Sequence, residues 1–146
     1  MKKILLILSL FVVSFAFVSC DDDDDKKIAL TDLPVNAQTF IQTHFPNNEV
    51  RLVTKDNDSY DVYLINGFEI DFDLSGEWDS IDGRGQLVPQ SIMELIPANI
   101  AVYIKEHFAQ GNITEVSKEL YGYEIGLNYG LDIKFDFNGN FLMVEN

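Results

Sequence analysis

The sequence predicts an α+β protein made of two tandem repeats, in each of which one helix packs on a four-stranded antiparallel β-meander. Three observations predict this fold class. One order of motifs occurs twice, each copy starts with apolar residues at helical spacing, and the rest of each copy alternates apolar and polar residues between tight turns. We expect the repeats to cover residues 30–86 and 87–146, after a signal segment at 1–19 and a tether at 20–29.

The first 19 residues have the composition of a secretory signal. Two lysines near the start precede an almost entirely apolar run, which is too short for a membrane-spanning helix. The run ends in Phe-Val-Ser-Cys, which resembles the lipobox of bacterial lipoproteins with Phe in place of the usual Leu. The resemblance implies cleavage before Cys20 and lipidation of its thiol. The alternative is an ordinary secreted protein in which Cys20, the only cysteine, is incidental.

Five consecutive aspartates at 21–25 follow the lipidation site. They act either as a solvated spacer or as a sorting signal, because acidic residues after a lipidated cysteine resemble the surface-export signal of Bacteroidetes lipoproteins. In other Gram-negative bacteria an aspartate here would favour retention in the inner membrane. We therefore expect a lipoprotein of the cell envelope, at the outer membrane, in the periplasm or exposed at the surface, with the choice of membrane and leaflet left open.

Charge limits the class of partner. The chain has 24 Asp and Glu against 10 Lys and Arg, a formal net charge of −14. Nucleic acid is therefore excluded as a partner, and cationic proteins or divalent ions are favoured. The hydrophobic content of 47% predicts a folded core rather than disorder.

The helix of the first copy is expected to begin near Pro34 and that of the second near Pro97, an offset of 63 residues. Proline is tolerated in the first turn because its missing amide has no helical partner there. Apolar residues then recur at spacings of three and four, which places them on one face. These residues are Leu33, Ala37, Phe40, Ile41 and Phe45 in the first copy, and Ile96, Ile100, Tyr103, Ile104 and Phe108 in the second.

Four strands are expected after each helix. In the first copy they lie near 50–53, 60–64, 68–73 and 78–81, with an Asn-Gly turn and a Ser-Gly turn around the third strand. The same offset places Tyr60 on Tyr123 and Gly76 on Gly139, without any gap. Two copies of one supersecondary unit are therefore predicted, too few for an ordinary solenoid.

The order of motifs resembles a known family. Each copy has a Pro-led helix ending in His-Phe, then Tyr-x-Val/Ile-x-Leu, Asn/Tyr-Gly and an Ile-x-Phe-Asp strand, and the first copy adds Gly-Glu-Trp. This pattern resembles the PepSY-like family, also described as resembling beta-lactamase-inhibitor proteins, which is common among Bacteroides-type exported lipoproteins. The resemblance covers residues 30–146. It implies a tandem helix-on-sheet fold and an interaction role rather than a catalytic one.

Catalytic and metal chemistry find little support in the sequence. His44 and His107 are expected to be structural, because each ends a helix where a partly positive imidazole complements the dipole. No Gly-x-Ser-x-Gly motif is present, so we expect a non-enzyme without a cofactor.

A calcium loop is an alternative reading of residues 71–82, where acidic residues have nearly the right spacing. That loop expects an incoming helix, whereas the residues before it alternate as a strand, and Lys134 replaces Asp71 in the second copy. We therefore assign no metal ligands and expect an ordinary hairpin.

The outer face of the predicted sheet is acidic. If Phe68, Ile70 and Phe72 pack under the helix, the acidic residues between them face away. Such a face is either a solvated surface or a protein-binding surface with aromatic anchors. Trp78 and Phe141 are the candidate anchors, and the alternation leaves their face open across the preceding turn. The residues that we expect to bind a partner are Asp61, Tyr63, Glu69, Asp71, Asp73, Trp78, Glu124, Asp132, Lys134, Asp136 and Phe141.

The sequence therefore predicts a lipid-anchored envelope protein that binds a basic protein or peptide through its open sheet. An exported enzyme, which the protein would inhibit or modulate, is one class of partner. A divalent-cation or small-ligand binding module is the alternative, and it would use the same carboxylates.

Overall fold

The computed structural model describes residues 25–145. The signal segment, Cys20 and residues 21–24 lie outside this range, so the expectations about them concern the sequence alone. Within 25–145, no helix is long and apolar enough to cross a membrane.

The strands of the described chain form one antiparallel sheet in which each strand pairs with the next along the sequence. The sheet is continuous across the middle of the chain, because the fifth strand pairs with the sixth. In sequence order, the nine strands are β1 (Lys26–Ile28), β2 (Val50–Lys55), β3 (Ser59–Leu64), β4 (Glu69–Asp73), β5 (Trp78–Asp82), β6 (Ile113–Glu119), β7 (Gly122–Leu127), β8 (Leu131–Asp136) and β9 (Phe141–Glu145).

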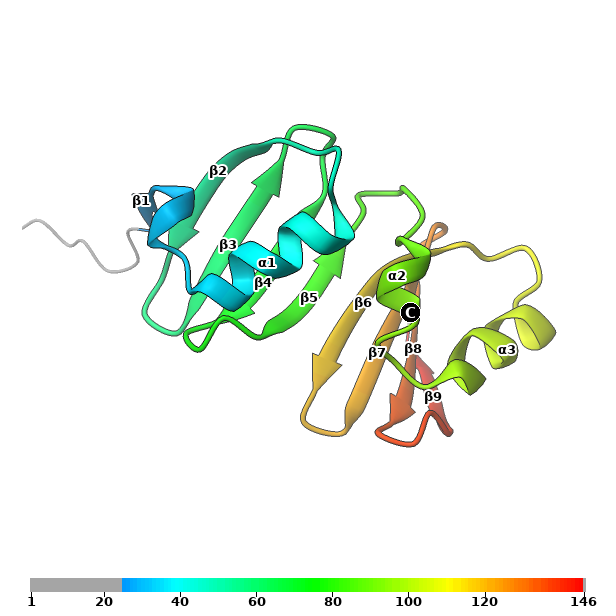
Figure 1. Ribbon diagram of the computed structural model, residues 1–146. Coiled ribbons are helices and arrows are strands. Elements are labelled where there is room, and N and C mark those ends of the chain that lie inside the picture. The colour runs from blue at the N-terminus through cyan, green and yellow to red at the C-terminus, as the bar shows by residue number, and fades with distance from the viewer. Residues whose placement is uncertain (1–24, 146) are drawn as a thin grey trace, which may run out of the picture.

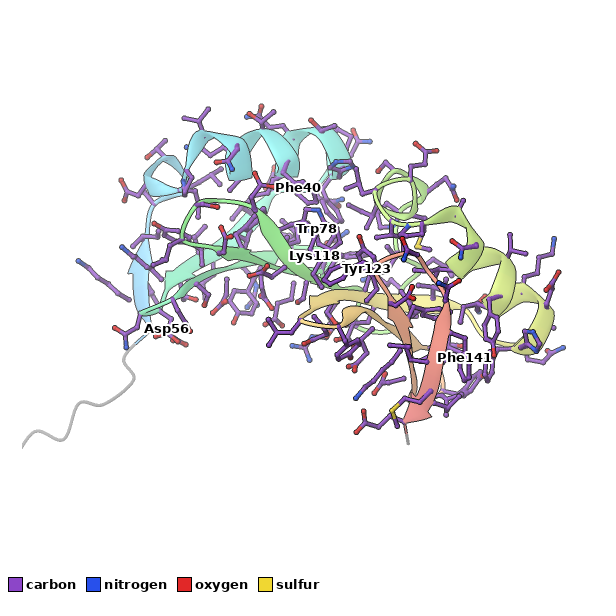
Figure 2. The ribbon with its side chains drawn as sticks, turned by 90° about the horizontal axis from the view of Figure 1, so that it is seen from below. Phe40, Asp56, Trp78, Lys118, Tyr123 and Phe141 are labelled. Atoms are coloured by element: carbon purple, nitrogen blue, oxygen red, sulfur yellow. The ribbon has the colours of Figure 1, made fainter. Side chains whose placement is uncertain are left out.

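The helices lie on one face of this sheet (Figure 1). A 3-10 turn, Leu30–Asp32, precedes α1 (Val35–His44), and α2 (Gln90–Met93) and α3 (Ala98–His107) lie between β5 and β6. In Figure 1, α1 lies over the half of the sheet that contains β3 to β5, and α2 and α3 accompany the half that contains β6 to β9. Figure 2 shows the helices along one side of the strands, while the other face of the sheet carries only its own side chains.

A row of aliphatic side chains crosses the helix-facing side of the sheet. Register places one member of the row on every strand, and six of the nine members are completely buried. The helices cover this row with Ala37 and Ile41 from α1 and Ile100 and Ile104 from α3. Hydrophobic burial of about 25 cal/mol per Å² therefore acts along the whole sheet. The row is Ile28, Val53, Val62, Ile70, Ile81, Val116, Ile125, Ile133 and Val144.

Each half of the structure joins its helix to its last hairpin by an asparagine. The Asn36 amide donates to the carbonyl of Ser75 at 3.0 Å, and the Asn99 amide donates to the carbonyls of Asn138 at 3.1 Å and Gly139 at 2.7 Å. The turn glycines Gly76 and Gly139 have φ of +84° and +78°, and a Cβ at either would meet the asparagine side chain at 2.4 Å. Glycine is needed for both the backbone conformation and the space.

Three details differ from the expectation. Residues 26–28 form β1 on the edge of β2, so the tether expected over 20–29 overlaps the sheet. The short helix α2 was not predicted. Pro34 and Pro97 cap α1 and α3 with extended ψ angles of 143° and 127°, so each helix begins one residue later than the proline.

Candidate functional site: the acidic face of the sheet

The side of the sheet opposite the helices carries two transverse rows of mainly polar side chains. One row contains Thr54, Asp61, Asp71, Ser80, Ser117, Glu124, Lys134 and Met143 in consecutive strands. The next row contains Leu52, Tyr63, Glu69, Asp82, Glu115, Gly126, Asp132 and Glu145. We call the carboxylates of these rows the acidic face: Asp61, Glu69, Asp71, Asp82, Glu115, Glu124, Asp132 and Glu145.

Like charges stand directly opposite one another in the second row. Asp82 pairs with Glu69 on one side and with Glu115 on the other. Direct cross-strand neighbours of equal charge repel. Arg84, in the loop after β5, relieves one of these contacts because its guanidinium binds Glu69 and lies 3.0 Å from the Asp82 carboxylate. Glu115 forms no ion pair among the described residues.

Gly126 lets two acidic side chains approach the backbone closely in the second half. A Cβ at this position would lie 2.8 Å from Glu115 Cβ, 3.1 Å from Glu115 Oε2 and 3.3 Å from Asp132 Oδ1, so both carboxylates flank the glycine. Burial raises the pKa of Glu115, with further contributions from the Asp82 and Asp132 charges. Burial and the charges of Glu124 and Glu145 likewise raise the pKa of Asp132. The two carboxylates therefore hold their negative charges at a cost.

In the first half, Asp71 is the carboxyl group whose surroundings oppose its negative charge most strongly. Burial raises its pKa to about 6, although a hydrogen bond from Ser80 at 2.7 Å acts in the opposite direction. Its other oxygen, Oδ1, is buried without a hydrogen-bond partner in the described structure. The neighbouring Asp61 also has a pKa raised by burial, and it accepts a hydrogen bond from Thr54 at 3.3 Å. A buried acceptor without a partner costs free energy that a donor from outside would recover.

Lys134, the one lysine in the two polar rows among the described residues, is already engaged. Lys134 binds Glu145 and lies 3.6 Å from Glu124 Oε2. Tyr121 donates a hydrogen bond to the same Glu124 oxygen at 2.8 Å, and Lys134 Nζ lies 5.5 Å from the centre of the Tyr121 ring. Within residues 25–145, Asp61, Asp71, Glu115 and Asp132 take part in no ion pair. Within the described residues, the centre of the face is therefore negative and has no ion pair of its own.

Most of the residues that we expected to bind a partner lie together on this face. Register and burial place seven there: Asp61, Tyr63, Glu69, Asp71, Glu124, Asp132 and Lys134. Asp73 and Asp136 lie at the ends of their strands, where they accept hydrogen bonds within the following turns. Their pKa values are lowered chiefly by hydrogen bonds from Ser75 and Asn140, respectively. These two aspartates hold hairpins and are less available to a partner.

Trp78 and Phe141, whose face the sequence left open, are not the aromatic anchors of the acidic face that we expected. Both lie on the helix-facing side of the sheet, where Trp78 stacks on Phe40 of α1 and Phe141 stacks on Tyr103 of α3. A register irregularity in each last hairpin, between Asp71 and Phe72 and between Lys134 and Phe135, inserts one residue and turns these aromatics to the other face. The acidic face therefore lacks the two aromatic anchors that the sequence predicted.

Sequence reasoning missed four contributors to the site. Asp82, Glu115 and Glu145 complete the rows, and Arg84 bridges two of their members. Glu115 could have been found, because it alternates with the buried Thr114 and Val116 in its own strand. The position of Asp82 depends on the bulge, which the sequence does not mark.

The histidines have separate environments. Burial lowers the pKa of His44, so the expected partly positive imidazole is disfavoured there. Its Nδ1 lies 2.9 Å from Ser91 Oγ and joins α1 to α2. Among the described residues no carboxylate bonds the His44 ring, so the third member of a catalytic triad is missing. His107 stacks on Tyr103, with ring centres 4.2 Å apart.

The acidic run at 71–82 forms a hairpin rather than a calcium loop. Asp73 Oδ1 accepts backbone hydrogen bonds from Ser75 at 2.8 Å and Glu77 at 3.0 Å, and Asp71 faces Ser80 across the two strands. Within residues 25–145 no group of three or more His, Cys, Asp or Glu side chains has a metal-binding arrangement.

Comparison with known proteins gives a consistent family. The sequence matches the family described as "Putative beta-lactamase-inhibitor-like, PepSY-like" over residues 22–62 and 58–143. No curated protein matches.

Three solved Bacteroides structures are similar. One, from Bacteroides thetaiotaomicron, is described as a "putative calcium-regulated periplasmic protein"; it is 31% identical with a TM-score of 0.76, and the match covers 84% of this chain and 98% of the other. A periplasmic protein of unknown function from Bacteroides vulgatus is 32% identical, with a TM-score of 0.78 and coverage of 84% and 100%. A second Bacteroides vulgatus protein, of the DUF2874 family, is 34% identical, with a TM-score of 0.75 and coverage of 85% and 98%.

These relatives are described as periplasmic, which supports a place in the cell envelope. Sequence pattern, sheet architecture and similarity agree, and the chain belongs to the PepSY-like family.

Proposed function

We propose that this protein is a non-catalytic envelope protein that binds a cationic protein or peptide through the acidic face. The observation that carries the proposal is the negative centre of that face, where Asp61, Asp71, Glu115 and Asp132 have no ion pair among the described residues. No helix covers this side of the sheet (Figure 2). A cationic partner would add the charges that the folded chain does not supply.

The raised pKa values support this reading. Glu115, Asp132 and Asp71 ionise less readily than ordinary carboxyl groups because of burial and neighbouring negative charge. A lysine or arginine from a partner would favour their charged forms, so part of the repulsion in the free protein would become attraction in the complex. The field of the face would also accelerate encounter with a basic surface at low salt.

The class of partner follows from the family description. Its members are described as beta-lactamase-inhibitor-like, which favours an exported enzyme as the partner of this chain. The mechanism would be occlusion, in which the flat sheet covers the entrance to the partner's active site and the carboxylates bind basic residues around it. The protein itself needs no reacting group for this role.

We further propose that Cys20 carries a lipid that holds the protein at the outer membrane, with its domain in the periplasm or at the cell surface.

We also propose that the two helix-and-meander halves are two copies of one ancestral unit. The same 63-residue offset relates their sequences, and Asp73 and Asp136 accept equivalent backbone bonds in equivalent turns.

The proposal is tested by capture with two variants of equal charge. The bait is the full chain with Glu115→Gln and Asp132→Asn, compared with a control that carries Glu94→Gln and Glu106→Gln, two exposed residues outside the sheet. We expect an envelope protein of the native bacterium to bind wild type and control and to be lost with the face variant. The partner is then purified, and its affinity is measured at increasing salt.

Equal binding of the purified partner to both variants would contradict recognition by the acidic face. Affinity that does not fall with salt would contradict the electrostatic mechanism, because exposed charge pairs are screened at high ionic strength.

Calcium binding is a second candidate. Its support is the description of the Bacteroides thetaiotaomicron relative as calcium-regulated, together with the partnerless Oδ1 of Asp71, which is a hard oxygen ligand. We expect calcium to raise the melting temperature of the wild-type protein more than magnesium does, and Asp71→Asn to remove the difference. An equal response of wild type and Asp71→Asn would exclude Asp71 as a ligand.

A further inference from the structure

The last strand has a free edge that differs from the rest of the sheet. Within residues 25–145, β9 pairs with β8 on one side and with no strand on the other. Three consecutive apolar side chains near this edge are exposed, with Phe141 at 40%, Leu142 at 48% and Met143 at 50%. An unpaired edge with apolar side chains is a template for another strand.

The first half of the molecule shows how a strand equivalent to β9 is covered by a neighbouring strand. β9 corresponds to β5 by the 63-residue offset, and β5 is paired with β6. In that pairing Ser80 lies opposite Ser117, and Ile81 lies opposite Val116. The offset takes β6 back to β2. A strand equivalent to β6 is therefore what β9 lacks, and β2 is the other strand of that kind.

The register of the missing pairing can be written residue by residue. Transferring the β5–β6 pairs by the offset places Met143 opposite Thr54, Val144 opposite Val53 and Glu145 opposite Leu52. Val144 and Val53 both belong to the aliphatic row, so the row would continue from one molecule to the next.

β1 now occupies this position on β2. Lys27 lies opposite Thr54, and Ile28 lies opposite Val53. The strand has only three residues, of which Lys26 and Lys27 are exposed and Ile28 is half-buried. β1 is therefore a short edge strand that buries one side chain only in part, which makes it the exchangeable partner of β2.

The aromatic residue at the start of β9 supports the same contact. In the first half, Lys118 of β6 places its ammonium 4.0 Å from the centre of the Trp78 ring, and Trp78 is only 6% exposed (Figure 2). Phe141 corresponds to Trp78 and has no such cover. The residue that corresponds to Lys118 is Lys55, at the end of β2. Pairing of β9 with β2 of another molecule would bring Lys55 over Phe141 and form a cation–π contact.

We infer that a second copy of this chain is the occupant of the β9 edge: β9 of one molecule pairs with β2 of the next after β1 has moved aside. The contact joins different surfaces of the two molecules, so it can repeat and yield chains of copies. It involves the sheet edges and does not depend on the proposed function of the acidic face. Both molecules are acidic, so salt should strengthen this association, whereas it should weaken capture of a basic partner.

The inference is tested by site-specific disulfides in the full chain. Cys20→Ser first removes the only native thiol. Thr54→Cys and Met143→Cys are then made in separate chains, mixed and oxidised. We expect a disulfide-linked dimer in the mixture, while each variant alone forms no disulfide-linked dimer. A single chain with both cysteines should give a ladder of longer species, because β2 and β9 lie seven strands apart, roughly 30 Å, and cannot cross-link within one molecule.

Two controls make the register decisive. Leu142→Cys, one residue away, should not cross-link to Thr54→Cys. The second pair, Leu52→Cys with Glu145→Cys, should cross-link in the same register and replaces the first pair if Thr54→Cys does not fold. Dimers of Met143→Cys alone would show that two β9 edges pair with each other and would overturn the proposal. Absence of disulfide-linked dimers in both mixtures would overturn it as well.

A third variant tests the role of β1. Lys27→Cys with Thr54→Cys, in the Cys20→Ser chain, should form a disulfide within one molecule and fix β1 on β2. Sedimentation of this fixed chain should show no association at a salt and protein concentration at which the Cys20→Ser chain associates. Association of the fixed chain equal to that of the free chain would exclude exchange of β1.

Discussion

Asp71 is the residue at which the cost of holding negative charge on the acidic face is clearest. It lies between Asp61 and Ser80 in its row, one oxygen is bonded by Ser80, and the other is buried without a partner. Ionisation of this carboxyl group costs free energy, because burial and the charges of Asp61 and Glu69 all oppose the negative form.

Asp71→Asn is therefore expected to stabilise the protein at neutral pH. The pKa of Asp71 is about 6 when folded, above its ordinary value, so the folded state binds more protons than the unfolded state in the interval between these values. The stability associated with the protonated form is complete below the unfolded pKa and is lost as pH rises through about 6. We expect a gain of about 1 kcal/mol at pH 7 after allowance for solvent screening. Urea unfolding across pH 4 to 7 measures it.

Asp73→Asn provides a control of opposite sign. The pKa of Asp73 is lowered chiefly by the hydrogen bond from Ser75, so its charged form stabilises the fold above the unfolded pKa, and this stability is lost as pH falls. The substitution should destabilise the protein at neutral pH. If Asp71→Asn and Asp73→Asn had effects of the same sign, the environment described for one of them would be wrong.

In each half, a side-chain hydrogen bond joins the helix to the last hairpin. The asparagine near the start of the helix bonds the turn, and a glycine in the turn leaves room for it. This contact links residues 39 or 40 positions apart in the sequence.

Asn36→Ala and Asn99→Ala should each lower the free energy of unfolding by about 1 kcal/mol, because each leaves a turn carbonyl without its donor. Gln42→Ala, at an exposed position of α1, serves as the control and should have little effect. Urea denaturation of the three variants measures the difference. Loss no greater than that of Gln42→Ala would mean that water replaces the asparagine at no cost.

The elements were predictable where side chains alternate simply. The spacing of apolar residues predicted helices close to α1 and α3, and the alternation in 60–64 and 68–72 predicted the faces of β3 and β4 correctly. The faces of Trp78 and Phe141 were not predictable, because a single inserted residue in a bulge reverses the alternation. β1 was missed because Lys26 and Lys27 continue a charged tether in composition, and only Ile28 indicates a strand.

On the scale of the whole molecule, repulsion between negative charges on one face of the sheet opposes hydrophobic burial on the other face. The chain has a net charge of −14, and the sheet gathers eight of its carboxylates into two adjacent rows. Burial of the aliphatic row on the opposite side stabilises the sheet and offsets the repulsion between these charges.

Added salt should therefore raise the melting temperature, because it screens repulsion on the acidic face. The variant with Glu115→Gln and Asp132→Asn should melt higher at low salt and respond less to added salt than the control with Glu94→Gln and Glu106→Gln. Thermal unfolding followed by circular dichroism measures this response. An equal salt response in both variants would show that the repulsion is spread over the whole surface.

The order of the strands also bears on how the chain folds. Because every strand pairs with its neighbour in sequence, most of the sheet can form from local hairpins as the chain emerges from an export channel, beginning at its N-terminal side. Two of these pairings are not local hairpins: the 3-10 turn and α1 separate β1 from β2, and α2 and α3 separate β5 from β6. The β5–β6 pairing, made through three residue pairs, is the seam between the two halves of the sheet. That seam closes only after the second helix is in place. It is therefore the natural boundary between two cooperative units, and the amide protons of Ser80 to Asp82 are where hydrogen exchange would report their separation.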